Sequence, residues 1–120
     1  MKYLLMIYMN DSIWESLSEE EHNEVFRGHG EFIKAITESG ELVSTEPLAG
    51  QSNSVTVRVR GGVPAATDGP FMEAKEYFCG YYLLDCESKE RAVELAARIP
   101  DAQYTAIEVR PLMDTAGSDL

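Results

Sequence analysis

The sequence predicts an α+β fold of the ferredoxin-like, split βαβ type, with an inserted β-hairpin. Three observations predict it. The chain has 120 residues, 44% of them hydrophobic, enough for one domain with its own core. Its apolar patterns follow the order strand, helix, strand, hairpin, strand, helix, strand. Two of the strands are apolar on both faces, although two helices cover only one face of such a sheet.

The first third of the chain predicts a strand, a helix and a second strand. Residues 2–9 (KYLLMIYM) are apolar on both alternations. Ser18 and Glu21 have the spacing of a capping box, so a helix begins there, and Gly40 is placed to end it. The apolar positions of this helix recur at helical spacing: Val25, Phe26, Phe32, Ile33 and Ile36. A short strand is expected at 41–45.

The middle of the chain predicts a hairpin. Residues 54–60 alternate strictly between valines and polar side chains, as in a strand with two unlike faces. The glycine pair at 61–62 is a two-residue turn signal, and a second short strand is expected at 63–67. The segment 68–71 (DGPF) then reads as a turn.

The last third predicts strand, helix and strand again. Residues 76–85 (EYFCGYYLLD) are apolar on both faces. Ser88 caps a helix that we expect to run to Ile99, where Pro100 stops it. The last strand is expected at 104–110. Because two helices leave one face of the sheet open, the sequence predicts a homodimer in which a second copy covers that face.

Composition limits the classes of partner. The chain has 10 basic and 21 acidic residues and a net charge of −11, which argues against nucleic acid and anionic membrane surfaces. No apolar run reaches membrane-spanning length, and the apolar start of the chain lacks a signal-peptide cleavage site. We therefore expect a cytoplasmic protein with a single domain at 1–113 and a C-terminal tail at 114–120.

The cysteines predict neither a disulfide framework nor a nucleophile. Cys79 and Cys86 are seven residues apart in one predicted strand, which separates them by about 23 Å on opposite faces. They cannot pair with each other, and a reducing compartment is the simplest setting for them.

The histidines are the first candidates for chemistry. His22 and His29 share one helix face, but seven residues are about 10.5 Å along the axis, too far to grip one metal ion together. No metal or cofactor is therefore expected. His29 lies on the apolar stripe and needs a hydrogen-bond partner there. Gly28 and Gly30 flank it and indicate a close approach to the backbone. The alternative is a core histidine bonded to a backbone carbonyl.

The DGPF turn offers that histidine a carboxylate. Asp68 would orient the His29 ring and tune its basicity, as a general base requires. The alternative is that Asp68 only caps its own turn. Glu73, Lys75 and Arg58 are candidate substrate contacts. The alternatives are a solvated loop for Glu73 and Lys75, and surface ion pairs with the first-helix glutamates for Arg58.

Several segments together resemble one known family. They are the opening KYLLMIY, His29-Gly30, TVRVR at 56–60, DGPFMEAKE at 68–76, GYYLLD at 80–85 and EVRPLM at 108–113. In these the chain resembles the YCII-related family, in its DGPF-motif branch. The resemblance implies a bacterial protein that forms a dimeric α+β barrel.

The resemblance also implies a range of functions. The wider family includes a dehydrochlorinase acting on chlorinated hydroxyquinols, and a histidine–aspartate pair has been suggested as its active centre. The matching positions here are His29 and Asp68. A cofactor-independent lyase- or isomerase-like enzyme is the first hypothesis. The alternative is a non-catalytic dimeric module that binds a ligand or protein in a sigma-factor-linked regulatory or stress setting.

Overall fold

The computed structural model describes residues 1–113, so the tail expected at 114–120 lies outside the described residues. The helices and strands follow the predicted order. They are β1 (Lys2–Asn10), α1 (Asp11–Ser16), α2 (Glu19–Glu38), β2 (Leu42–Pro47), β3 (Val55–Arg60), β4 (Val63–Asp68), β5 (Glu76–Asp85), α3 (Lys89–Ala96) and β6 (Ala106–Pro111). Two short 3₁₀ helices, η1 (Gln51–Asn53) and η2 (Pro100–Gln103), lie between them.

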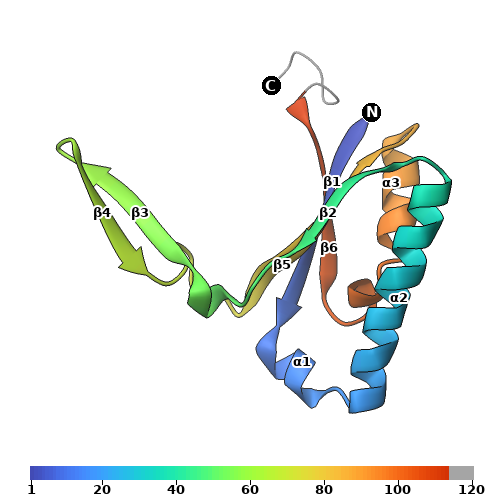
Figure 1. Cartoon of the computed structure of the whole chain (residues 1–120), viewed down its shortest axis with the longest axis horizontal. Coiled ribbons are helices and arrows are strands. Elements are labelled where there is room, and N and C mark those ends of the chain that lie inside the picture. The colour runs from blue at the N-terminus through green and yellow to red at the C-terminus, as the bar shows by residue number, and fades with distance from the viewer. Residues whose placement is uncertain (114–120) are drawn as a thin grey trace.

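Four of the strands form one antiparallel sheet in the order β2-β5-β1-β6. The two strands at its centre, β1 and β5, are those whose sequences are apolar on both alternations. Helices α2 and α3 lie on the same side of this sheet (Figure 1). This strand order with both helices on one face confirms the ferredoxin-like α+β fold.

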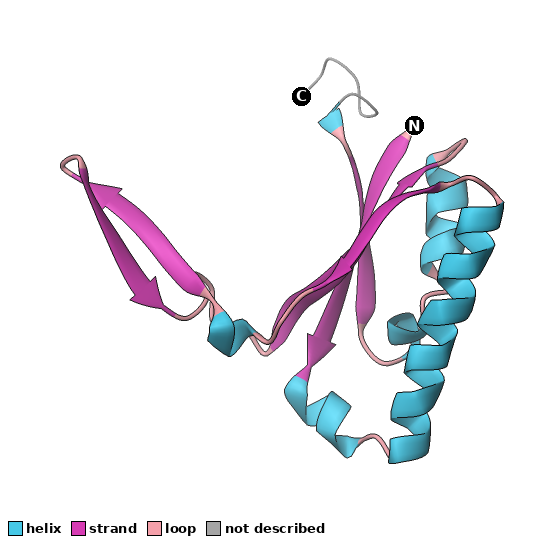
Figure 2. Ribbon diagram, viewed as in Figure 1, coloured by secondary structure: helices cyan, strands magenta, loops and turns pink. Residues whose placement is uncertain are grey.

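The core lies between the sheet and the two long helices (Figure 2). On β1 the buried side chains alternate with half-buried ones, so one face of the strand meets the helices. The largest fully buried side chains come from both layers: Leu5, Ile36, Tyr82, Leu84, Leu95 and Ile99. The opposite face of β1 and β5 carries half-buried apolar side chains, and none of the helices within residues 1–113 described above covers it.

Local signals set the helix boundaries. Ser18 Oγ accepts the Glu21 N–H at 3.1 Å, and the Glu21 carboxylate accepts the Ser18 N–H at 2.9 Å, which completes the capping box. Gly40 follows α2 with a φ of 78°, a conformation that favours glycine. Helix α3 ends at Ala96, three residues before the predicted end. From there the chain tightens into a turn, with the Ile99 N–H donating to the Ala96 carbonyl.

The hairpin β3–β4 is a separate two-stranded sheet, which we call the arm. Gly61 and Gly62 connect its strands with φ values of 56° and 79°, as the predicted tight turn requires. Figure 1 shows the arm projecting away from the main sheet, on the side opposite the helices.

Within residues 1–113, no helix is long and apolar enough to cross a membrane. Cys79 and Cys86 are both free, as predicted. Both contact the helix-covered core, however, so the expectation of opposite faces was wrong. A β-bulge in β5 near Cys79 shifts its register, and Cys86 lies just beyond the end of the strand.

Candidate functional site

His29 lies on α2 with both ring nitrogens hydrogen bonded to side chains distant in sequence. Its Nε2 lies 2.5 Å from Asp101 Oδ1, and its Nδ1 lies 2.6 Å from the Tyr82 hydroxyl. The His29 side chain is 22% exposed, whereas that of Asp101 is only 8% exposed. The three side chains form a continuous hydrogen-bonded series, which we call the triad.

The triad fixes the hydrogen positions of a neutral imidazole. An ionised carboxylate only accepts hydrogen bonds, so Nε2 of His29 carries the hydrogen and donates it to Asp101. Nδ1 is then the acceptor, and the Tyr82 hydroxyl donates to it. Burial, followed by the negative charge of Asp101, raises the pKa of Tyr82 well above its usual range. Tyr82 is therefore a neutral phenol that donates its hydrogen to His29.

Asp101 reaches His29 because η2 packs closely against α2. A Cβ atom on Gly28 would lie only 2.5 Å from Cγ of Pro100, so only glycine leaves room for the proline ring. The close approach expected from this glycine is therefore present. Gly30 is different, since a Cβ there would meet nothing within 4 Å. The Asp101 carbonyl also accepts the backbone N–H groups of Tyr104 and Thr105, which hold the turn.

The triad borders a pocket of about 550 Å³ between the sheet and the first two helices. Most of its walls are apolar or aromatic, with side chains such as Ile7, Met9, Trp14, Phe26, Ile33 and Tyr77. Two carboxylates, Glu46 and Asp101, reach it, and no lysine or arginine is among its described lining residues. A concave, mostly apolar pocket with a few convergent polar groups is typical of a small-molecule site.

Cys79 also lines this pocket but is poorly suited to be a nucleophile. Burial, and to a smaller degree the charge of Asp101, raises the pKa of the Cys79 thiol to about 11. At neutral pH it is therefore a protonated thiol, and it contributes to the pocket as a small apolar side chain.

Asp68 does not occupy the position that the sequence suggested. It is the last residue of β4 and is exposed on the arm, on the other side of the sheet from α2 (Figure 1). The carboxylate bonded to His29 within this chain is that of Asp101. The reason is topological: η2 returns the chain to α2, whereas the DGPF turn lies at the base of a hairpin that projects from the sheet.

The three predicted substrate contacts also lie outside the triad pocket. Arg58 lies on the arm with its guanidinium 5.3 Å from the ring centre of Phe71. Lys75 is exposed in the segment before β5. Glu73 lines a second, more polar pocket of about 600 Å³ at the base of the arm.

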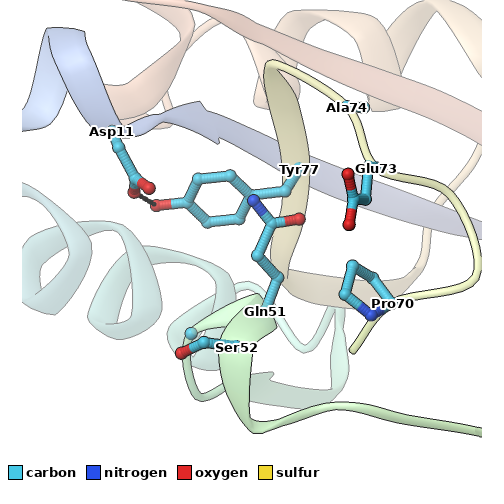
Figure 3. Close-up of a pocket in the computed structure, with 8 residues that line it drawn as sticks. Asp11, Gln51, Ser52, Pro70, Glu73, Ala74 and Tyr77 are labelled. Carbon is cyan, nitrogen blue, oxygen red and sulfur yellow. Dashed lines mark hydrogen bonds between the residues drawn. The ribbon is translucent and has the colours of Figure 1, made fainter. Parts of the chain in front are cut away.

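This second pocket is separated from the triad pocket by Tyr77, which lines both. Figure 3 shows the Tyr77 hydroxyl meeting Asp11, to which it donates at 2.8 Å. Burial and this hydrogen bond raise the pKa of Tyr77 to about 12. Glu73 and Gln51 lie beside Tyr77 (Figure 3). In the triad pocket, by contrast, the candidate base His29 is hydrogen bonded to a carboxylate and a phenol.

His22 has a structural role. Its Nε2 donates to the backbone carbonyl of Trp14 at 2.7 Å, and the two rings stack at 4.2 Å. This contact ties α1 to α2, and Trp14 also lines the triad pocket. Among residues 1–113, no group of three His, Cys, Asp or Glu side chains has the arrangement to hold a metal ion.

Sequence reasoning did not identify Asp101 and Tyr82 as members of the site. Asp101 follows a helix-stopping proline, where a polar turn residue is ordinary, and Tyr82 is one of several aromatic residues in an apolar strand. One signal for Asp101 was present. Gly28 and Pro100 are complementary in size, and each adjoins a member of the triad.

Comparisons with known proteins agree with this architecture. A family model of the YCII-related domain matches residues 1–116. The chain is also 32% identical over 114 residues to a protein of Rhizobium meliloti (strain 1021) described as "Uncharacterized protein R00369". That match covers 93% of this chain and 92% of the relative. The chain therefore belongs to the YCII-related family.

Proposed function

We propose that this protein is a cofactor-independent enzyme that uses His29 for general acid–base chemistry on a small molecule. The observation that carries the proposal is the triad beside an apolar pocket. Asp101 takes the orienting role that the sequence suggested for Asp68. A histidine held by a buried carboxylate, with its other nitrogen accepting a hydrogen bond from a phenol that can pass a proton to it, is suited to this chemistry.

The proposed proton path runs through Tyr82. A substrate proton is taken by the phenol oxygen while the Tyr82 proton passes to Nδ1 of His29. The imidazolium that forms is stabilised by the carboxylate of Asp101. Tyr82 then gives up the substrate proton, to another position of the substrate in an isomerisation or to solvent when chloride leaves in an elimination. His29 returns its proton to the Tyr82 oxygen, so the enzyme ends in its starting state. Elimination and isomerisation both fit this cycle.

The pocket charge limits the substrate class. Carboxylates reach the pocket, no cationic side chain is among its described lining residues, and the whole chain carries −11. Phosphate or carboxylate groups would be repelled there. Uncharged ring compounds fit the aromatic walls and the volume of about 550 Å³. Arg58, Glu73 and Lys75 lie outside this pocket, so the proposed substrate contacts are its own aromatic rings.

The test is turnover of chlorinated hydroxyquinols and related uncharged phenols, followed as chloride release and by ultraviolet absorbance. We expect His29→Asn to lower kcat/KM by about 10²–10⁴-fold. Tyr82→Phe distinguishes proton transfer directly from the substrate to His29 from proton transfer relayed through Tyr82, because only the relay needs the Tyr82 hydroxyl. Asp68→Asn is the matched carboxylate control and should retain activity. Full activity of His29→Asn would contradict the proposal.

A second candidate function rests on one specific observation. Both ring nitrogens of His29 are already satisfied inside the protein, so the ring needs no substrate to complete its hydrogen bonds. A non-catalytic module that binds a small ligand or a protein, in a regulatory or stress setting, would need only the pocket. Ligand-dependent quenching of Trp14 fluorescence, without turnover and unchanged in His29→Asn, would favour this function.

We also propose that two copies pair through the open face of the sheet. Its half-buried apolar side chains are Leu4, Met6, Tyr8, Phe78 and Leu83, and the register places them side by side. Apolar patches of this kind mark interaction surfaces. Sedimentation at micromolar concentration should give twice the chain mass of 13.4 kDa.

A further inference from the structure

The rest of the described chain, residues 1–113, covers little of the arm. Nearly all of its residues are exposed, and a two-stranded hairpin alone is only marginally stable in water. Its projection makes the molecule extended. The radius of gyration is 16.5 Å, against about 14 Å for a compact domain of this length.

The two faces of the arm differ in chemistry. Val57 pairs with Ala66 and Val59 pairs with Pro64, so these four side chains form one apolar face. The exposed fractions of Val57 and Val59 are 63% and 66%. The other face carries two arginines and two threonines together with two small apolar side chains: Arg58, Arg60, Thr56, Thr67, Ala65 and Val63. An apolar face this exposed is characteristic of a surface that another molecule covers.

The apolar surfaces of the arm and the sheet border the same concavity. A groove of about 910 Å³ at the base of the arm is lined by Val55 and Val57 on one side and by Tyr8 and Phe78 on the other. Figure 1 shows the arm and the sheet diverging from this point, with the helices on the far side of the sheet. Each molecule therefore presents an apolar projection next to an apolar recess.

We propose that the arm is a clasp that packs its valine face against a second copy of this chain. When two copies meet about a twofold axis, the apolar projection of each copy can pack into the apolar recess of the other. This inference rests on the proposed pairing of the open sheet faces. It adds a second contact, made by the arm, whose loss raises the dissociation constant of the dimer.

Charge favours a second copy as the occupant. The arm, residues 55–68, contains two arginines and one acidic residue, Asp68, whereas the rest of the chain contains 8 basic and 20 acidic residues. The arm is thus a cationic segment that is attracted to the acidic body of another copy. The acidic body also makes a nucleic acid a poor occupant.

The experiment compares one substitution at two exposed valines. Val57→Glu alters the arm, and Val93→Glu introduces the same charge on α3, where Val93 is 51% exposed. Sedimentation equilibrium should show the dissociation constant of the dimer rising about tenfold or more for Val57→Glu and unchanged for Val93→Glu. The double variant Arg58→Glu/Arg60→Glu should weaken the dimer more at low salt than at high salt, because salt screens the charges.

A second measurement locates the contact. In dimers mixed from ¹³C-labelled and unlabelled copies, filtered nuclear Overhauser effects should connect the Val57 methyls of one copy to the other copy. A Val57→Glu protein that dimerises like the wild type would overturn the clasp and leave sheet pairing in place. A monomeric wild type would overturn both, without touching the catalytic proposal. Dimers without contacts from Val57 to the other copy would also overturn it.

Discussion

The body and the arm of this protein differ in how their side chains are held. In the body, the sheet and two helices bury a continuous core, and every member of the triad is bonded to another element. In the arm, two strands bond to each other and their side chains face solvent. Yet the DGPF turn and the TVRVR strand, which stand out most in the sequence, belong to the arm and its base.

This difference shows that a conspicuous motif and a reactive site are separate things. Acid–base chemistry needs a buried, oriented group, which only a packed body provides. Turn and alternation motifs show how the chain bends, and they stand out in exposed hairpins because short-range rules alone decide such structures. Asp68 belongs to the second kind of region, and Asp101 to the first.

The largest expected effect separates core from arm. Leu95→Ala removes a side chain with 0% exposure and should lower the free energy of unfolding by about 2–5 kcal/mol. Val59→Ala, at a side chain with 66% exposure, should change it by about 0.5 kcal/mol or less in a dilute monomeric sample. Urea unfolding measures both. A large loss from Val59→Ala would mean that the arm belongs to the cooperative core.

An intermediate effect tests how the body positions its carboxylate. Gly28→Ala should force Pro100 away from α2 and cost about 1–3 kcal/mol. It should also shift the Nε2 resonance of His29 in long-range ¹H–¹⁵N spectra, because Asp101 moves with Pro100. Gly30→Ala is the matched control. It meets open space and should stabilise the helix by up to about 1 kcal/mol, with the His29 resonances unchanged.

The smallest expected effect concerns an ion pair of the body. Arg91 donates two hydrogen bonds of 3.0 Å to Glu41, and these bonds hold the pKa of Glu41 below its usual value. Because the folded-state pKa is lowered, the stabilisation is complete above the unfolded-state pKa and is lost as the pH falls through the folded one. Glu41→Gln should cost about 1 kcal/mol at pH 7.

The pH dependence supplies the check on this pair. Urea-unfolding free energies of the wild type and Glu41→Gln should converge as the pH falls below the carboxyl range. Glu94→Gln removes the other carboxylate that pairs with Arg91. The Glu94 side chain is 66% exposed, so this variant should change the free energy of unfolding by about 0.5 kcal/mol or less. Equal losses from the two variants would show that burial does not distinguish these pairs.

The sequence by itself determined the elements and their order. Strand alternation, the capping box at Ser18 and the glycine turn at 61–62 all act between neighbours within a few residues. The same short-range rules placed His29 on the core-facing side of its helix. The two predicted helices were also enough to indicate that only one face of the sheet is covered by helices, and the two-sided apolar pattern of β1 and β5 indicated that the other face is apolar as well.

Only the tertiary structure decided the partners. His29 is separated from Tyr82 by 53 residues and from Asp101 by 72. The contact with Asp101 depends on how closely η2 packs on α2, which in turn depends on the missing side chain of Gly28. The direction of the arm depends on where β3 and β4 leave the sheet. Such placements follow from the packing of all layers together, and no local pattern encodes them. Many turns of similar sequence carry a carboxylate, and only the packing of the whole domain decides which carboxylate reaches His29.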